Sequence, residues 1–165
     1  MKARNFRKIK NMSYTRRKYM GGIPGSRIVK FTMGNTQGDF DYTVKLLNLK
    51  DAQIRHNALE AARIAANRLL ELKLGRDNYK LKIVPFPHQV LREHKRLAVA
   101  QADRFQEGMA RAYGKPVGVA ARVKRGKPIL VAEVPKEGVD VAKEALRRAS
   151  HKFPIPCKIT INQNN

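Results

Sequence analysis

The residues between Ala100 and Arg125 include the side chains of this chain that are best suited to binding phosphate. Arginine holds a phosphate group through a planar fork of donors, and glycine lets the backbone approach a surface closely. The first half of the segment has no continuous apolar face, so it is predicted to be an exposed loop that a polyanion orders. Its cations and glycines are Arg104, Arg111, Lys115, Arg122, Lys124, Arg125, Gly108, Gly114 and Gly118.

A second concentration of cations lies at the N-terminus, where no acidic residue precedes Asp39. Phe6, Tyr14 and Tyr19 are interleaved with these cations, and a glycine-rich turn follows at residues 21–25. The aromatic rings can stack on bases or pack against the domain, and the sequence leaves both alternatives open. The cations between residues 1 and 30 are Lys2, Arg4, Arg7, Lys8, Lys10, Arg16, Arg17, Lys18, Arg27 and Lys30.

The whole chain shares this positive charge. Its 35 Lys and Arg residues against 13 Asp and Glu residues give a net charge of +22. Such an imbalance costs self-repulsion and adds nothing to the fold, so it predicts a polyanionic partner; a surface charged only for solubility usually mixes both signs. At 165 residues with 42% hydrophobic residues, the chain is expected to form a single domain over residues 1–165.

Several classes of chemistry are not indicated. The glycine spacing Gly108 to Gly114 lacks the Ser or Thr of a phosphate-cradling loop, because Pro116 follows Lys115. The four histidines have no metal-ligand spacing, and no serine lies in a nucleophile-elbow pattern. The single Cys157 excludes an internal disulfide and is interpreted as a small buried hydrophobe. We therefore expect no enzyme, cofactor or metal, no membrane span, and a cytoplasmic protein.

Hydrophobic periodicity predicts strands alternating with two helices. The first helix should cover residues 58–74, with Asn57 and Glu60 forming a capping box and Gly75 ending it. Its apolar face is predicted from Ala58, Ala61, Ala62, Ala65, Leu69 and Leu72. The second helix should cover residues 139–150 and bury Ala142, Ala145, Leu146 and Ala149. Strands are expected at residues 28–33, 42–47, 79–84, 89–92, 117–123, 129–134 and 157–161.

Two cationic features depend on these elements. Residues 117–123 and 129–134 are predicted to form a hairpin whose tip carries Lys124, Arg125 and Lys127. Such a tip is either a solvated turn or a phosphate probe, and the overall charge favours the probe. Arg148 lies near the end of the second helix, where cations that complement the helix dipole are the alternative explanation.

Longer strings of residues resemble a known family. They are LEAARIAAN at 59–67, the segment 87–92, ADRFQEGM at 102–109, GKPVG at 114–118 with ARV at 121–123, EALRRA at 144–149 and KFP at 152–154. Together they cover nearly the whole chain and resemble the large-subunit ribosomal protein L-ten-e of archaea and eukaryotes, the counterpart of bacterial L-sixteen. The short polar end at 162–165 is similar to the archaeal form.

The resemblance implies an α+β fold in which two helices pack on a mixed, mostly antiparallel sheet with a hammerhead-like β element and a long basic loop. It implies a structural role without catalysis, as a monomer within the ribosome, bound to large-subunit rRNA of the 23S type with 5S-adjacent elements and to neighbouring ribosomal proteins. It also implies a place near the aminoacyl-tRNA site and the peptidyl-transferase centre, with the loop at 101–118 directed at tRNA and mobile without it.

The charge distribution and the family resemblance together predict which side chains bind RNA. They divide between the extended N-terminal segment at 1–27, the loop at 101–118, the predicted hairpin and the second helix. A DNA-compacting protein and an RNA-modifying enzyme remain as alternatives, but the chain has neither repeats nor a catalytic cluster. The predicted residues are Arg4, Arg7, Lys8, Lys10, Arg16, Arg17, Lys18, Arg104, Arg111, Lys115, Arg122, Lys124, Arg125, Lys127 and Arg148.

Overall fold

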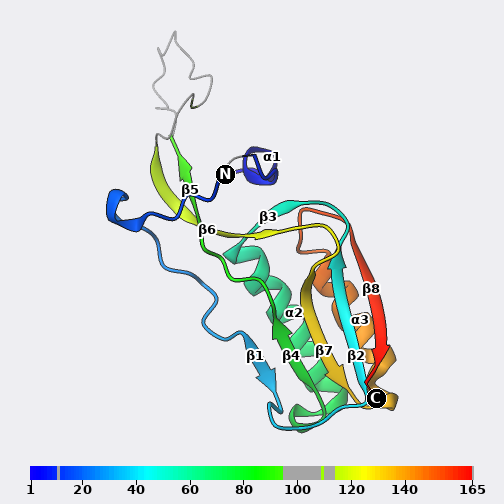
Figure 1. Ribbon diagram of the computed structural model, residues 1–165. Helices are drawn as coiled ribbons and strands as arrows, with labels where there is room; N and C mark the ends of the chain where they lie inside the picture. The colour runs from blue at the N-terminus through cyan, green and yellow to red at the C-terminus, as the bar shows by residue number, and fades with distance from the viewer. Residues whose placement is uncertain (11, 95–108, 110–113, 165) are drawn as a thin grey trace, which may run out of the picture.

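The computed structural model describes residues 1–10, 12–94, 109 and 114–164. Two antiparallel sheets and two long helices make up the body of the molecule (Figure 1). The larger sheet has the strand order β1-β4-β7-β2-β8 and the smaller one the order β3-β6-β5. The elements are α1 (Ala3–Phe6), β1 (Thr32–Gly34), β2 (Tyr42–Asn48), β3 (Ala52–Arg55), α2 (His56–Leu74), β4 (Lys80–Ile83), β5 (Gln89–Glu93), β6 (Lys115–Val123), β7 (Pro128–Val134), α3 (Val139–Ser150) and β8 (Cys157–Gln163), with short 3₁₀ turns at Arg17–Tyr19, Arg76–Asn78 and Lys136–Gly138. The predicted α+β class is confirmed.

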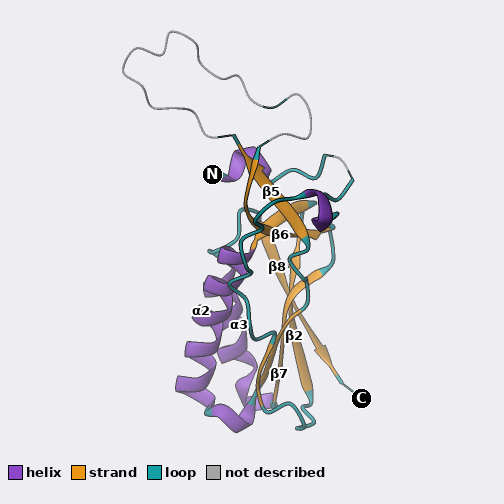
Figure 2. Cartoon of the chain, turned by 90° about the vertical axis from the view of Figure 1, so that its left-hand side faces the viewer, coloured by secondary structure: helices purple, strands orange, loops and turns teal. Residues whose placement is uncertain are grey.

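The core lies between one face of the larger sheet and the two long helices, which cover that face together (Figure 2). Val44 on β2 is paired with Ala132 on β7, which is paired with Leu81 on β4, and all three side chains are fully buried. Successive side chains of a strand point to opposite faces of the sheet. The sequence neighbours of these buried residues, such as Lys45 and Lys82, therefore lie on the opposite, polar face.

The second predicted helix is confirmed with its bounds and its buried face. α3 covers Val139–Ser150 and buries the same three alanines and one leucine that its periodicity indicated. No helix in the described parts of the chain is long and apolar enough to cross a membrane.

The first predicted helix is correct at its end and wrong at its beginning. α2 begins at His56, its N-cap position is Arg55, and no side chain caps it, so Asn57 lies inside the first turn. Glu60 pairs instead with Arg63 at 2.5 Å, which removes it from the predicted capping box. Gly75 ends the helix with φ +78°, and its N–H donates to the carbonyl of Glu71.

The buried face of α2 also differs from the predicted one, because the chain leaves β3 directly into the helix and fixes its rotation. Leu72 is 78% exposed, whereas fully buried side chains occur at Leu59, Ala62 and Leu70. The face against the sheet and α3 is made by His56, Leu59, Ala62, Ala66, Leu69 and Leu70.

The predicted strands are confirmed with small shifts, except that β1 begins at Thr32, four residues later than expected, and that β3 was missed. The predicted hairpin is wrong. β6 pairs with β3 and β5, whereas β7 pairs with β2 and β4, so the two strands lie in different sheets. Periodicity identifies a strand but not its partner, and here both strands pair with strands that come earlier in the chain.

Residues 124–127 therefore connect the two sheets, and we call them the crossover turn. They run beside the connection between β2 and β3. The backbone of Asn48 bonds the turn twice, donating to the carbonyl of Lys127 at 3.3 Å and accepting from the N–H of Gly126 at 2.9 Å. Gly126 has φ +78°, a conformation that favours glycine.

Candidate nucleic-acid interface

We call residues 1–30, three more than the predicted 1–27, the N-terminal segment; its described parts, 1–10 and 12–30, pass the smaller sheet at one end of the molecule before the chain reaches β1 (Figure 1). It reaches both edge strands of that sheet. The N–H of Gln53 on β3 donates to the carbonyl of Arg7 at 2.8 Å, and the N–H of Val90 on β5 donates to the carbonyl of Tyr14 at 3.1 Å. Because both edges are covered in this way, the basic segment has a defined path across the sheet.

A buried glutamine holds the segment at each edge. The Nε2 of Gln53 donates to the carbonyls of Phe6 at 2.9 Å and Lys8 at 3.1 Å, and the side chain is only 7% exposed. On the other edge, the Oε1 of Gln89 accepts a hydrogen bond of 2.6 Å from the N–H of Tyr14. On the side of the segment, these hydrogen bonds use backbone groups only. Its cationic side chains take no part in them.

A third anchor lies at the far end of the segment. The N–H of Arg27 donates to Nδ1 of His56, the first residue of α2, at 2.9 Å. Burial, followed by the charges of Arg55 and Arg27, lowers the pKa of His56 and favours the neutral imidazole that can accept this bond. β6 approaches the ring closely, since a Cβ at Gly118 would lie 3.2 Å from Nε2.

Two of the three aromatic residues of the segment pack against the domain, which is one of the two alternatives left open by the sequence. The guanidinium of Arg92 lies 4.1 Å from the ring centre of Tyr14, and that of Arg55 lies 5.9 Å from the ring of Phe6. These two rings pack against the smaller sheet. Tyr19 is 67% exposed, and Nζ of Lys18 lies over its ring at 4.9 Å from the ring centre.

The predicted cations of the segment are exposed, as a phosphate-binding surface requires. Among the described residues, the ion pairs of side chains lie on α2, on α3 and between β4 and β7, and none involves a side chain of the N-terminal segment. Arg7 also donates to the carbonyl of Pro154 at 3.4 Å, which links the segment to the connection after α3. The exposed predicted cations are Arg4, Arg7, Lys8, Lys10, Arg16, Arg17 and Lys18.

The crossover turn presents Lys124, Arg125 and Lys127 to solvent. Its shape is fixed from inside by Asn48, whose side chain is fully buried and donates to the carbonyls of Lys50 at 2.9 Å and Val123 at 3.4 Å. The carboxylate of Asp51 accepts from the N–H of Arg125 at 2.6 Å. The turn therefore holds three cations on a rigid base.

The other predicted residues have different positions. Arg104 and Arg111 lie outside the described residues. Lys115 is exposed and begins β6, so residues 115–118 of the predicted loop are strand. Arg122 donates to the carbonyl of Met12 at 3.2 Å and thus helps to hold the N-terminal segment. Arg148 is exposed on the last turn of α3 and pairs with Glu144 at 2.5 Å.

Sequence reasoning missed the polar residues that position these cations. Asn48, Gln53 and Gln89 are buried amides within strands, and His56 is one of the four histidines for which the sequence indicated no metal-ligand spacing. Only Gln89 lay in a predicted strand and gave a signal, since a buried polar amide needs a partner. Gln53 lies in the strand that was not predicted, and Asn48 lies one residue beyond the predicted strand at 42–47. Which partner a buried amide finds depends on tertiary structure.

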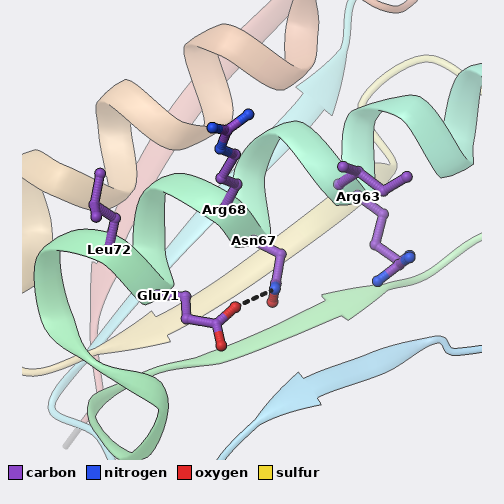
Figure 3. A pocket seen from close by; sticks show the side chains of 6 residues that line it. Arg63, Asn67, Arg68, Glu71 and Leu72 are labelled. Atoms are coloured by element: carbon purple, nitrogen blue, oxygen red, sulfur yellow. Dashed lines mark hydrogen bonds between the residues drawn. The ribbon is translucent and has the colours of Figure 1, made fainter.

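A depression of about 590 Å³ also lies on α2 (Figure 3). Two of its polar side chains are already bonded, because Asn67 donates to Glu71 at 3.2 Å and Arg63 pairs with Glu60. We assign it no function. It is lined by Arg63, Ile64, Asn67, Arg68, Glu71 and Leu72.

Comparison with known proteins gives a consistent result over almost the full chain. The family model described as ribosomal protein L16p/L10e matches residues 9–160. The chain is 55% identical over 146 residues to large ribosomal subunit protein uL16 of Staphylothermus marinus, covering 88% of this chain and 84% of that protein. It is 48% identical over 164 residues to the protein of the same name from Sulfolobus acidocaldarius, with 98% and 93% covered.

A third relative, uL16 of Archaeoglobus fulgidus, is 48% identical over 163 residues, covering 99% of this chain and 93% of that protein. All three organisms are archaea, in agreement with the resemblance to the archaeal form. The chain belongs to the ribosomal protein L16p/L10e family.

Proposed function

We propose that this protein binds large-subunit rRNA through the N-terminal segment and the crossover turn, near the aminoacyl-tRNA site and the peptidyl-transferase centre, and so supports tRNA positioning in translation. One observation carries the proposal. The backbone of the N-terminal segment is bonded to Gln53, Val90 and Gln89, while its predicted cations remain exposed. A fixed backbone with free cations lowers the entropy lost when phosphates are bound.

Family membership gives the coarser part of this function. A member of the L16p/L10e family is a structural constituent of the large ribosomal subunit, in the cytoplasmic ribosome, and not an enzyme. The proposal concerns the RNA-binding surface, the kind of contact and the location within the subunit.

The proposed contacts are mainly with the RNA backbone. The deep, narrow major groove of double-stranded RNA hides its base edges, so the cations recognise shape and phosphate spacing rather than sequence. Exposed Tyr19 is available to stack on an unpaired base. We further propose that Arg104, Arg111 and Lys115 approach tRNA or the RNA walls around it, and that neighbouring ribosomal proteins and 5S-adjacent elements complete the environment.

The test is the salt dependence of binding to a large-subunit rRNA fragment. A variant with Lys124, Arg125 and Lys127 changed to Ala should bind more weakly, and its log-log salt slope should fall by about 2, since each lost phosphate contact contributes about 0.7–0.9. A matched control carries the same change at exposed Lys73, Arg76 and Lys136, at the other end of the body, and should behave as wild type. Equal effects of the two variants would contradict the proposed surface.

The DNA-binding and enzymatic alternatives are tested separately. At equal salt, the protein should bind folded rRNA more tightly than duplex DNA, because its cations are arranged for RNA shape. In a sucrose gradient of cell lysate, a tagged copy should migrate with the large subunit and dissociate as salt rises. Equal affinity for DNA, or migration as a free protein at moderate salt, would contradict the proposal.

A further inference from the structure

The outer edge of β8 is a free strand edge. The N–H of Leu49 donates to the carbonyl of Pro156 at 3.1 Å, and the N–H of Asn164 donates to the carbonyl of Asp41 at 2.7 Å. Alternate residues of an antiparallel strand direct their backbone groups to the same neighbour. With the register Tyr42↔Gln163, the backbone of Lys158, Thr160 and Asn162 faces β2. The residues whose backbone groups face away are Cys157, Ile159, Ile161 and Gln163.

Nothing in the described part of the chain covers this edge. β8 is the last strand of the larger sheet, and no described backbone group bonds its outer side. It is seven residues long, contains no proline, and carries a single cation, Lys158. Ile161 is 42% exposed. Proteins usually blunt such an edge, so its persistence points to a partner strand.

An acidic cavity of about 480 Å³ lies where the edge ends. Asn164 joins the two features, since its Oδ1 accepts from Thr43 at 2.8 Å and its Nδ2 donates to the carbonyl of Phe40 at 2.8 Å. The cavity is lined by Gly38, Asp39, Phe40, Asp41, Thr43, Glu133 and Asn164.

The charge of this cavity is opposite to that of the chain as a whole. Glu133 is neutralised by Lys80 at 2.9 Å, whereas Asp39 and Asp41 are exposed and form no ion pair with a described residue. Two unneutralised carboxylates on a chain with net charge +22 repel phosphate and attract a cation.

We propose that an extended, lysine- or arginine-rich segment of another protein adds as a strand to the outer edge of β8 and places one cation in the cavity beside Asp39 and Asp41. Backbone hydrogen bonds to the edge supply the affinity, and the carboxylates select basic segments. A free row of N–H and C=O groups matches a peptide backbone and not an RNA. A second copy of this chain fits poorly, because two chains of net charge +22 repel each other. This inference does not rest on the proposed RNA-binding surface.

Amide hydrogen exchange, followed by NMR with a synthetic peptide of alternating lysine and valine, tests the geometry. The amides of Ile159 and Ile161 should exchange fast in the free protein and become protected when the peptide binds. The amides of Lys158 and Thr160, which already face β2, should be protected in both states. A peptide with glutamate in place of lysine should bind at least about tenfold more weakly.

Two variants test the contributions separately. Ile161→Pro removes an outward N–H and leaves the bonds to β2 in place, so it should weaken peptide binding about tenfold. The double variant Asp39→Asn with Asp41→Asn should weaken it similarly and does not alter the strand. The matched control is Asp77→Asn with Glu137→Gln, two exposed acids that form no described ion pair, and it should bind as wild type.

Several outcomes would overturn the proposal. They are an absence of binding, equal binding of the glutamate peptide, protection of amides outside β8, or equal effects of the Asp39/Asp41 variant and its control. Protection of Ile159 and Ile161 that rises with protein concentration without peptide would instead assign the edge to a second copy. Folding of each variant is checked by its β2–β8 amide signals, and the Asp39/Asp41 pair decides the matter if the proline variant fails to fold.

Discussion

The backbone N–H of Arg27 is bonded to Nδ1 of His56 at 2.9 Å, which fastens the end of the basic N-terminal segment to the first turn of α2. The bond requires an unprotonated Nδ1. Burial and two neighbouring arginines, Arg55 and Arg27, already disfavour the charged ring. The attachment of this end of the segment is therefore linked to the protonation of a single imidazole.

We expect the stability of the fold to decrease as the pH falls below about 6.5, the ordinary pKa of histidine. The pKa of His56 is lowered in the folded protein, so over this range the unfolded chain binds more protons than the folded one. The contribution is fully present above the unfolded pKa and is lost as the pH falls toward the lowered folded pKa. Urea unfolding between pH 8 and pH 5 measures it.

Two matched variants, His56→Asn and His88→Asn, separate the contribution of His56 to the pH dependence of stability from that of other titrating groups. In His56→Asn, the amide oxygen can still accept from Arg27 but does not titrate, so the loss of stability in acid should be smaller than in wild type. His88→Asn changes an exposed histidine and should keep the wild-type profile. Identical profiles for all three proteins would contradict the linkage.

Gln53→Leu should release the first part of the N-terminal segment without unfolding the body. Two hydrogen bonds to the carbonyls of Phe6 and Lys8 are lost, each contributing about 0.5–1.5 kcal/mol. Trypsin should therefore cleave at Arg7 and Lys8 about tenfold faster or more. Gln37→Leu, at an exposed position, is the control. Unchanged cleavage would mean that the side chain is not an anchor.

Gly34→Ala should destabilise the larger sheet by roughly 3 kcal/mol. Gly34 has φ +84°, and an added Cβ would lie 2.1 Å from the carbonyl oxygen of Tyr79. Neither the strained φ nor the clash with backbone is relieved by a side-chain movement. Gly25→Ala meets nothing within 4 Å and should unfold with wild-type thermodynamics. Similar unfolding midpoints for the two variants would contradict this reason for glycine at position 34.

The thiol of Cys157 should be a poor nucleophile at neutral pH. Burial raises its pKa to about 11 from the ordinary 9.0, which lowers the thiolate fraction at pH 8 by about 100-fold. Labelling with a thiol-specific disulfide reagent should be slow in the native protein and fast in urea. Equal rates in both states would show that the group is not shielded.

The sequence identified elements better than it identified contacts. β2, β4, β7, β8 and α3 follow from periodicity, because each has one face toward the same core. β3 was missed since four residues between Asp51 and His56 are too few for a periodic signal. The end of α2 was correct because Gly75 acts locally, whereas its beginning depends on the position of β3 and not on Asn57.

In the candidate surface, too, the sequence identified the residues of one kind and missed those that depend on tertiary contacts. Its cations are conspicuous in the sequence, since charge needs no structural context to be recognised. The residues that hold them are not, because Gln53 and Gln89 acquire their role only when β3 and β5 lie at opposite edges of one sheet. Arg122 was predicted to bind RNA. In the structure its guanidinium donates to the backbone carbonyl of Met12, a contact that no local sequence pattern predicts.

The path of the N-terminal segment has a consequence for the order of events during synthesis. Its contacts join residues far apart in the chain: Tyr14 to Gln89 across 75 positions and Met12 to Arg122 across 110. The first residues to leave the translating ribosome therefore find their sites only after most of the chain has emerged. Until then the backbone of this cationic segment has no fixed path, and contacts of such long range form late in folding. The N-terminal segment thus reaches its final path only after the chain has been synthesised as far as β6.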